Sequence, residues 1–221
     1  MVDKPKIAMI GDGNVGTALT QGLTRAGYEV QAVGKEPERV RELAKWGEVI
    51  VLAVPFAERQ NAIREIGEAG RGKVIVDVTN AMGDKMSFAG SAQQSGAEEI
   101  QEWARDAKVV KAFNTVFAQL MSEGKVHGEK LTMLAAGNDE GAKRRVLEMG
   151  GALGFDAVDA GPLENARWLE TLGYFNIKMG YAQGFGPASG WKYVHTATAE
   201  SEGRTAEGGA RKAEEHTGAR R

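Results

Sequence analysis

Short runs of apolar residues alternate with longer amphipathic stretches through the first 160 residues of the chain. The run at 48–54 is apolar at almost every position, which is typical of a strand buried on both faces of a parallel sheet. The remaining runs are shorter and are also bounded by polar or glycine-rich segments. The pattern predicts strands at 6–10, 29–33, 48–54, 73–78, 109–113, 131–136 and 155–159.

The stretches between these strands carry the three- and four-residue spacing of helices with one apolar face. Val15, Leu19 and Leu23, for example, mark one face of the first helix. Helices are therefore predicted at about 17–26, 37–46, around 63–66, 97–104, 115–122 and 140–150.

Strands that alternate with helices indicate crossover connections and a mostly parallel sheet. We therefore expect an α/β protein with a Rossmann-type, doubly wound fold and a small C-terminal helical part. The joint between helix 37–46 and strand 48–54 is very short, so it leaves no sequence for the further strand that many dinucleotide-binding folds have there. The polar stretch 81–96 is predicted to be a long loop, and long loops inside compact domains are often functional.

After residue 160 the pattern changes to one long helix and a polar tail. The helix begins at Gly161-Pro162, reaches about 183 and carries one apolar stripe. Gly173 and Gly180 interrupt it, and each either permits close approach of a second backbone or a flat ligand, or is merely tolerated. We predict a dinucleotide-binding domain at 1–160, a helical segment at 161–195 that closes the cleft, and a disordered tail or loose solvated helix at 196–221.

Composition excludes several classes of function. The formal net charge of -2 gives no electrostatic reason to expect nucleic acid or a membrane as a partner. The chain has no cysteine, which excludes disulfides and a thiolate nucleophile, and its scattered histidines give no reason to expect a metal site. No run approaches the roughly 18 apolar residues of a membrane span, and the first strand begins too early for a signal peptide. We expect a soluble, cytoplasmic protein.

A glycine-rich turn connects the first strand to the first helix. A strand, a G-x-G-x-x-G turn and a helix form the first unit of a dinucleotide-binding fold. Gly11 permits the tight turn, Gly13 lets the backbone approach a pyrophosphate, and Gly16 lets the helix pack closely on the strand. Unpaired N–H groups at the helix N-terminus then face the phosphates. The candidate cofactor contacts in this turn are Gly11, Asp12, Gly13, Asn14, Val15 and Gly16.

In an open parallel sheet a ligand lies beyond the carboxyl ends of the strands. Besides the glycine turn, these ends are Gly34-Lys35, Val54-Pro55-Phe56, Thr79-Asn80, Ala112-Phe113-Asn114-Thr115 and Gly137-Asn138. None offers an obvious general acid or base, so we expect no catalytic side chain. This suits direct hydride transfer between two bound cofactors, which needs the reacting carbons held about 3–3.5 Å apart more than it needs proton chemistry. The further candidate cofactor contacts are Val54, Pro55, Asn80, Ala112 and Asn114.

The residues after the second strand bear on the choice between NAD and NADP. NAD-binding proteins tend to place an Asp or Glu there for the ribose 2′-hydroxyl, and Val33-Gly34-Lys35 has neither. Lys35 and Arg39 could hold the 2′-phosphate of NADP, or could be ordinary solvated surface cations. Glu36 lies between them and weakens the case, but the sequence favours NADP.

Several stretches, taken together and in order, resemble the coenzyme F420-dependent NADP oxidoreductases. The likeness covers about residues 6–193 and extends to the NADP-binding domain of membrane ferric reductases. The Lys-Ala-Phe-Asn-Thr and Asp-Ala-Gly-Pro-Leu stretches are the most specific. The matching stretches are 10–16, Leu52-Ala53-Val54-Pro55, Val76-Asp77-Val78-Thr79-Asn80, 109–116, 159–163, Ala166-Arg167 and Glu170.

The resemblance implies hydride transfer between NADP(H) and the deazaflavin coenzyme F420. It places NADP over the glycine turn with its nicotinamide near Val54-Pro55 and Asn80, and the deazaflavin on the nicotinamide beneath the late segments. Members of the family often have Ser/Thr-Arg after the second strand, whereas this chain has Gly34-Lys35-Glu36.

Two other functions remain open from the residues alone. One is an NADPH-dependent reductase of another small acceptor, such as an imine, a flavin or a ferric chelate. The other is a non-catalytic module that senses NADP. In each case the expected partners are small molecules, and the apolar stripe of the late helix also leaves a homodimer open.

Overall fold

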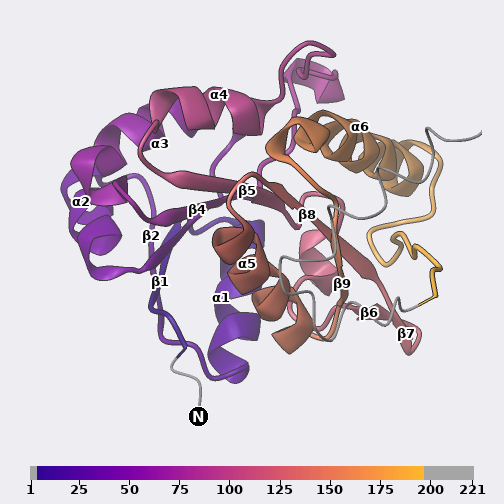
Figure 1. Cartoon of the computed structure of the whole chain (residues 1–221). Coiled ribbons are helices and arrows are strands. Elements are labelled where there is room, and N and C mark those ends of the chain that lie inside the picture. The colour runs from indigo at the N-terminus through magenta and orange to yellow at the C-terminus, as the bar shows by residue number, and fades with distance from the viewer. Residues whose placement is uncertain (1–3, 197–221) are drawn as a thin grey trace, which may run out of the picture.

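The computed structural model describes residues 4–196, so the tail predicted at 196–221 lies, apart from Thr196, outside the described residues. Seven strands form one sheet in the order β2-β1-β3-β4-β5-β8-β9, and two short strands form a separate pair (Figure 1). The strands are β1 (Ile7–Ile10), β2 (Val30–Val33), β3 (Val49–Leu52), β4 (Val74–Asp77), β5 (Lys108–Ala112), β6 (Lys125–Val126), β7 (Glu129–Lys130), β8 (Thr132–Gly137) and β9 (Asp156–Asp159).

Helices connect most of these strands, and short 3₁₀ segments fill several of the remaining joints. The α-helices are α1 (Asn14–Arg25), α2 (Pro37–Trp46), α3 (Arg59–Ile66), α4 (Gly96–Trp103), α5 (Glu140–Ala152) and α6 (Ala166–Ile177), which continues as the π-helical turn η6 (Lys178–Ala182). The 3₁₀ segments are η1 (Phe56–Glu58), η2 (Gly67–Gly70), η3 (Asp84–Met86), η4 (Ala118–Leu120) and η5 (Leu163–Asn165).

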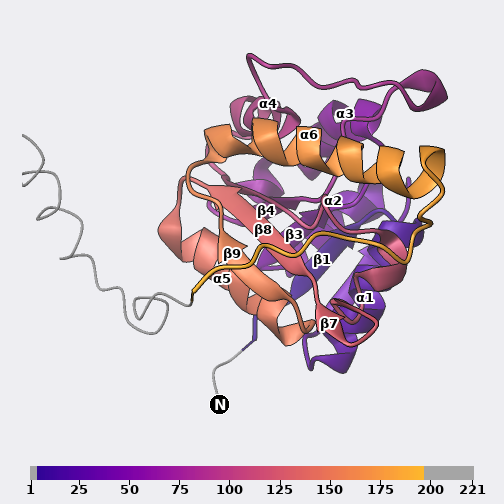
Figure 2. The same ribbon diagram turned by 90° about the vertical axis from the view of Figure 1, so that its right-hand side faces the viewer.

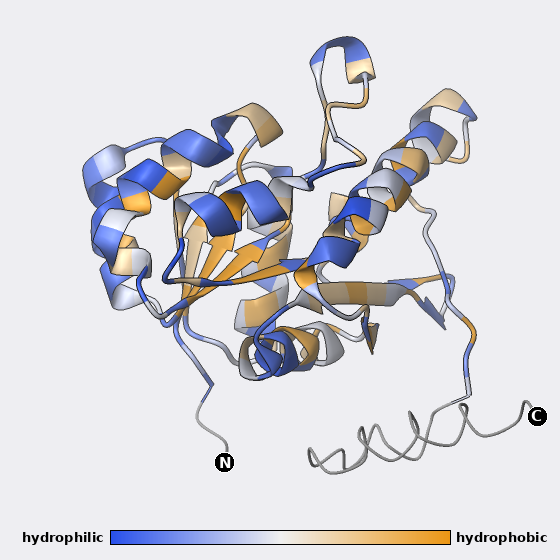
Figure 3. Cartoon of the chain, turned by 45° about the horizontal axis from the view of Figure 1, so that its top comes forward, coloured by the Kyte–Doolittle hydropathy of each residue, from blue (hydrophilic) through white to orange (hydrophobic). Residues whose placement is uncertain are grey.

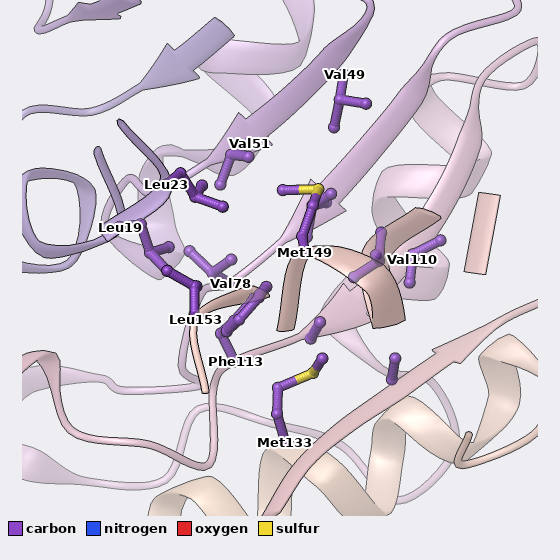
Figure 4. Close-up of a cluster of buried hydrophobic side chains, with 14 of the residues drawn as sticks. Leu19, Leu23, Val49, Val51, Val78, Val110, Phe113, Met133, Met149 and Leu153 are labelled. Carbon is purple, nitrogen blue, oxygen red and sulfur yellow. The ribbon is translucent and has the colours of Figure 1, made fainter. Parts of the chain in front are cut away.

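The helices cover both faces of the sheet and create two apolar cores. Alternate residues of β3 point to opposite faces, so Val49 and Val51 belong to one core and Ile50 and Leu52 to the other. The first core contains side chains of α1 and α5 (Figure 4), and the second contains side chains of α2, α3 and α4. Figure 3 shows the apolar strands between helices whose outer faces are hydrophilic. The predicted doubly wound α/β fold is confirmed.

β2 forms the edge of the sheet, and no further strand lies between α2 and β3, as the short joint in the sequence predicted. The chain passes from α2 directly into β3 through Gly47, where a β-carbon would lie 2.6 Å from that of Ala8. The ammonium group of Lys73 closes the end of α2, donating to the carbonyls of Ala44, Lys45 and Gly47 at 2.7, 2.8 and 2.6 Å. Lys73, which directly precedes β4, thus stabilises the short connection between α2 and β3.

The β5–β8 connection corrects one predicted helix. β8 is antiparallel to β5, with Gly137 opposite Val110 and Ala135 opposite Ala112. Antiparallel neighbours need no crossover helix, so the helix predicted at about 115–122 was wrong. The short turn η4 and the β6–β7 hairpin, which the pattern did not predict, occupy this connection.

The reversed direction of β8 also corrects one predicted strand end. Its carboxyl end, Gly137-Asn138, lies beside the start of β5 rather than beside the ends of β1 to β5. These two residues therefore do not join the other strand ends.

Helix α6 packs across the end of the sheet beside α4 (Figure 2). The guanidinium of Arg167 donates to both oxygens of Glu98, at 2.9 and 2.6 Å. Glu98 also accepts from the backbone N–H of Ser95, whose hydroxyl caps the start of α4. One carboxylate thus joins the start of α4 to α6.

Among residues 4–196, no helix is long and apolar enough to cross a membrane.

The Glu98–Arg167 pair predicts a specific acid sensitivity. Burial by itself raises the pKa of the Glu98 carboxyl, but hydrogen bonds from Arg167 and Ser95 outweigh it and hold the pKa below its usual value of 4.5. A carboxyl whose pKa is lower in the folded state stabilises the fold above its unfolded pKa, and this stabilisation is lost as the pH falls through the folded value. Stability should therefore decline as the pH falls below 4.5.

Urea unfolding between about pH 6 and about pH 3 measures this contribution. Arg167→Met should lose less stability than the wild type over that range, because its Glu98 pKa is no longer held down. Arg64→Met removes an exposed arginine of α3 and should keep the wild-type pH dependence. Parallel curves for the wild type and Arg167→Met would contradict the assignment.

Candidate functional site

Register brings the ends of the parallel strands to one edge of the sheet. Ile10 pairs with both Val33 and Leu52, Leu52 pairs with Asp77, and Asp77 pairs with Lys111. The residues that follow these positions therefore lie side by side along the carboxyl edge. They are Gly11, Gly34, Ala53, Val78 and Ala112.

Two glycines of the first turn are required by the chain's own packing. Gly11 has φ +113°, and a β-carbon there would lie 2.2 Å from the carbonyl oxygen of Ala53. A β-carbon at Gly16 would lie 1.9 Å from the carbonyl oxygen of Gly11. Any side chain at either position would force the turn apart.

Gly13 has the opposite environment. No atom lies within 4 Å of the position that its β-carbon would take. Gly13 precedes α1, whose first turn has no acidic residue and no side-chain cap. The N–H groups of Asn14, Val15 and Gly16 lack partners within the helix. The open space and these donors fit the phosphates of a dinucleotide, so this end of α1 can hold a pyrophosphate.

The tip of β2 carries charges of both signs. Lys35 is exposed. Arg39 is also exposed and lies 2.7 Å from Glu36, which leaves its charge partly compensated. The carboxylate of Asp12 packs on Gly34, where a β-carbon would lie 2.8 Å from Oδ2 and 3.2 Å from Oδ1.

The remaining predicted residues lie in two different settings. Val54 and Pro55 follow β3, and Asn80 follows β4, all three at least partly accessible at the carboxyl edge. Ala112 is fully buried and Asn114 is 2% exposed, so these two lie behind the surface of the edge. The sheet thus brings the predicted positions to one edge but buries two of them.

Asn114 connects the end of β5 to helix α6. Phe113 has φ +63°, a left-handed conformation that turns the chain sharply after β5. The Asn114 amide then donates to the carbonyl of Leu169 at 2.7 Å and to Oδ1 of Asn80 at 3.4 Å. Asn176 donates in turn to the carbonyl of Thr115 at 3.2 Å. Helix α6 is therefore hydrogen-bonded directly to the strand end.

The two glycines of the late helix allow this close approach. A β-carbon at Gly173 would lie 2.5 Å from Nδ2 of Asn114 and 2.6 Å from Oδ1 of Asn80. One at Gly180 would lie 2.5 Å from the ring of Phe117. Of the alternatives that the sequence left open, the contacts favour close packing on the chain's own strand ends.

A buried ionic cluster lies directly behind this edge, and the sequence reasoning missed it. Lys111 is fully buried, and its ammonium group donates to Oδ2 of Asp77 at 2.9 Å and to the carbonyl of Thr79 at 2.6 Å. Oε1 of Glu170, on α6, lies 3.4 Å from the same ammonium. The available signal was an aspartate at the end of the apolar strand β4 and a lysine between the apolar residues Val110 and Ala112 of β5.

Glu170 also caps helix α4. Its two oxygens accept the N–H groups of Gly96 at 3.1 Å and Ala97 at 3.3 Å. The other oxygen of Asp77 accepts the N–H of Thr79 at 2.9 Å, which fixes the turn that presents Asn80. The cluster therefore holds the end of β4, the start of α4 and helix α6 in one arrangement.

Removal of the central cation should destabilise the protein strongly. Lys111→Met leaves two buried carboxylates without their cation, and breaking a buried ion pair in this way costs about 3–5 kcal/mol of unfolding free energy. Lys45→Met, at an exposed position of α2, should change it by less than about 0.5 kcal/mol. Urea unfolding at neutral pH measures both, and a Lys111→Met variant as stable as Lys45→Met would refute the role of the cluster.

One hollow in the described residues lies elsewhere. It measures about 530 Å³ and opens at the amino end of β5, where Arg105, Lys108 and Asp139 contribute to its lining. The Lys108–Asp139 ion pair, at 3.0 Å, crosses this region. The hollow lies at the opposite edge of the sheet from the glycine turn, so it is not part of the candidate site.

The sequence and the fold are similar to those of known proteins. Residues 6–47 match the family model described as NADP oxidoreductase coenzyme F420-dependent. The F420-dependent NADP reductase of Methanocaldococcus jannaschii is 30% identical over 156 residues, which cover 68% of each chain. The metalloreductase STEAP3 of Rattus norvegicus is 30% identical over 183 residues, which cover 77% of this chain but only 36% of that protein.

A solved structure shows the same fold over most of the chain. The putative F420-dependent NADP reductase from Arthrobacter sp. FB24 is 26% identical and has a TM-score of 0.79. The match covers 86% of this chain and 100% of that one. The fold, the glycine turn and these similarities together show that the chain belongs to the family of F420-dependent NADP oxidoreductases.

Proposed function

We propose that the protein transfers a hydride between NADP(H) and the deazaflavin coenzyme F420. The observation that carries this proposal is the open, uncapped N-terminus of α1 beside Gly13, at a sheet edge that α6 partly covers. The F420-dependent NADP reductase of Methanocaldococcus jannaschii supports the choice of both cofactors.

The residues present fit an NADP molecule laid along the carboxyl edge. The N–H groups at the start of α1 would hold the pyrophosphate, and Lys35 would attract the 2′-phosphate. Val54, Pro55 and Asn80 would border the nicotinamide. When both are bound, the nicotinamide and the deazaflavin supply the hydride donor and acceptor. The protein's contribution is to hold the two rings face to face and to exclude water.

The helical segment 161–195 would close the cleft over these rings. Its hydrogen bonds to Asn114 and Thr115 set its distance from the strand ends. The outer face of α6 leaves Trp168 and Phe175 exposed, at 71% and 50%, and we propose that a second copy of the chain covers them. We place the reaction in the cytoplasm, where both cofactors are small soluble partners.

A ferric chelate is the second candidate acceptor. The metalloreductase STEAP3 is as similar in identity as the methanogen reductase and matches more of this chain. The match spans only about a third of that relative's length, however, so most of the relative has no counterpart in this chain. A cofactor-binding module without turnover remains the non-enzymatic alternative.

Stopped-flow absorbance separates these functions. NADPH mixed with the protein and oxidised F420 should bleach the deazaflavin band, and NADH, a flavin and a ferric chelate serve as parallel arms. Fast NADPH-dependent bleaching supports the proposed reaction. Tight binding of NADPH without bleaching would move the assignment to another acceptor or to the sensing module.

Gly13→Val tests the position of the pyrophosphate. Gly13 has an extended backbone, with φ −71° and ψ −171°, and no neighbour near its missing side chain, so the fold should tolerate valine. The branched side chain would instead stand over the start of α1, and the affinity for NADPH should fall by more than about tenfold. Isothermal titration measures the affinity and thermal unfolding provides the control. Wild-type affinity in a folded variant would refute this position.

A further inference from the structure

Gly34 is the first residue beyond β2, and the carboxylate of Asp12 lies next to it. Gly34 has no side chain, and both carboxylate oxygens of Asp12 lie within 3.2 Å of the point where a β-carbon of residue 34 would stand. In dinucleotide-binding folds an acidic side chain near the end of the second strand hydrogen-bonds the ribose 2′-hydroxyl. Asp12, from the glycine turn, therefore brings a carboxylate to the end of the second strand.

The glycine at position 34 is what makes this placement feasible. A side chain there would begin 2.8 Å from Oδ2 of Asp12, closer than β-carbons approach such atoms. The backbone of Asp12 is held in turn by the hydroxyl of Thr17, which donates to its carbonyl oxygen at 3.1 Å. Among residues 4–196, no lysine, arginine or histidine forms an ion pair with the Asp12 carboxylate, so its charge is available to a ligand.

The cations near this point do not outweigh that charge. Arg39 is held by Glu36 at 2.7 Å, and both side chains are well exposed. Lys35 is the remaining exposed cation directly after Gly34. The ribose end of the site therefore presents the carboxylate of Asp12, which repels a 2′-phosphate, and the ammonium of Lys35, which attracts it.

We propose that Asp12 reads the 2′ position of the adenosine ribose, and this rests on the proposed use of a nicotinamide dinucleotide. Its carboxylate accepts a hydrogen bond from the 2′-hydroxyl of NAD(H) and repels the 2′-phosphate of NADP(H), while Lys35 attracts that phosphate. Opposed charges give a narrow preference, so the protein binds NADH as well as NADPH within a modest ratio of affinities. Asp12 thus limits the ratio of NADPH affinity to NADH affinity.

Isothermal titration of NADPH and NADH at fixed ionic strength tests the proposal. Asp12→Asn keeps the shape and removes the charge, and should raise the ratio of NADPH to NADH affinity by about tenfold, since like charges in contact weaken binding strongly. Lys35→Gln should lower the same ratio. Glu29→Gln removes one exposed carboxylate before the start of β2, at the opposite end of the strand, and should leave the ratio unchanged.

The same titrations with adenosine 2′,5′-bisphosphate and AMP attribute the effect to the ribose end without the nicotinamide. An unchanged ratio in Asp12→Asn, or an equal change in Glu29→Gln, would overturn the role of Asp12 while leaving the dinucleotide site intact. No binding of either dinucleotide to the wild-type protein would overturn the proposed function and this inference with it.

Discussion

The buried contact between Lys111, Asp77 and Glu170 is the constraint on which the rest of the site depends. Two carboxylates and one ammonium occupy a region that water does not reach, and such groups are costly to bury without partners. Backbone N–H groups from two further segments complete their hydrogen bonding. The cluster is therefore satisfied only when β4, β5, α4 and α6 are all in place, which couples α6 to the sheet beneath it.

The three glycines of the first turn have two different environments. Gly11 and Gly16 are fixed by contacts with the chain's own carbonyl groups, whereas Gly13 borders open space. A turn of this kind is rigid before any ligand arrives, so little conformational freedom is lost on binding. This agrees with a reaction in which the protein contributes position more than acid–base chemistry.

Much of the fold followed from the sequence because its signals were local. The apolar run at 48–54 predicted a doubly buried strand, and the short joint after α2 correctly excluded a further strand. The direction of β8 was not accessible in this way, because strand direction depends on the connection, and the residues after Phe113 have helix-like composition but form turns and a hairpin. The same limit applies to Asp12 and Gly34, whose contact joins positions far apart in the chain.

The direction of β8 and β9 determines where the last helix starts. Both strands end at the edge away from the glycine turn, where Leu163 donates to Asn138 at 2.9 Å, and α6 must then travel back toward the strand ends. Its later turns consequently pack on the segment that follows β5, where Asn176 donates to the carbonyl of Thr115 and Gly180 lies against the ring of Phe117. The chain after η6 then returns to the sheet, where the N–H of Thr132 at the start of β8 donates to the carbonyl of Trp191 at 2.9 Å. The reversed strand pair thus lets one helix run from one edge of the sheet to the other, so that both of its ends are bonded to strands or to the segments that follow them.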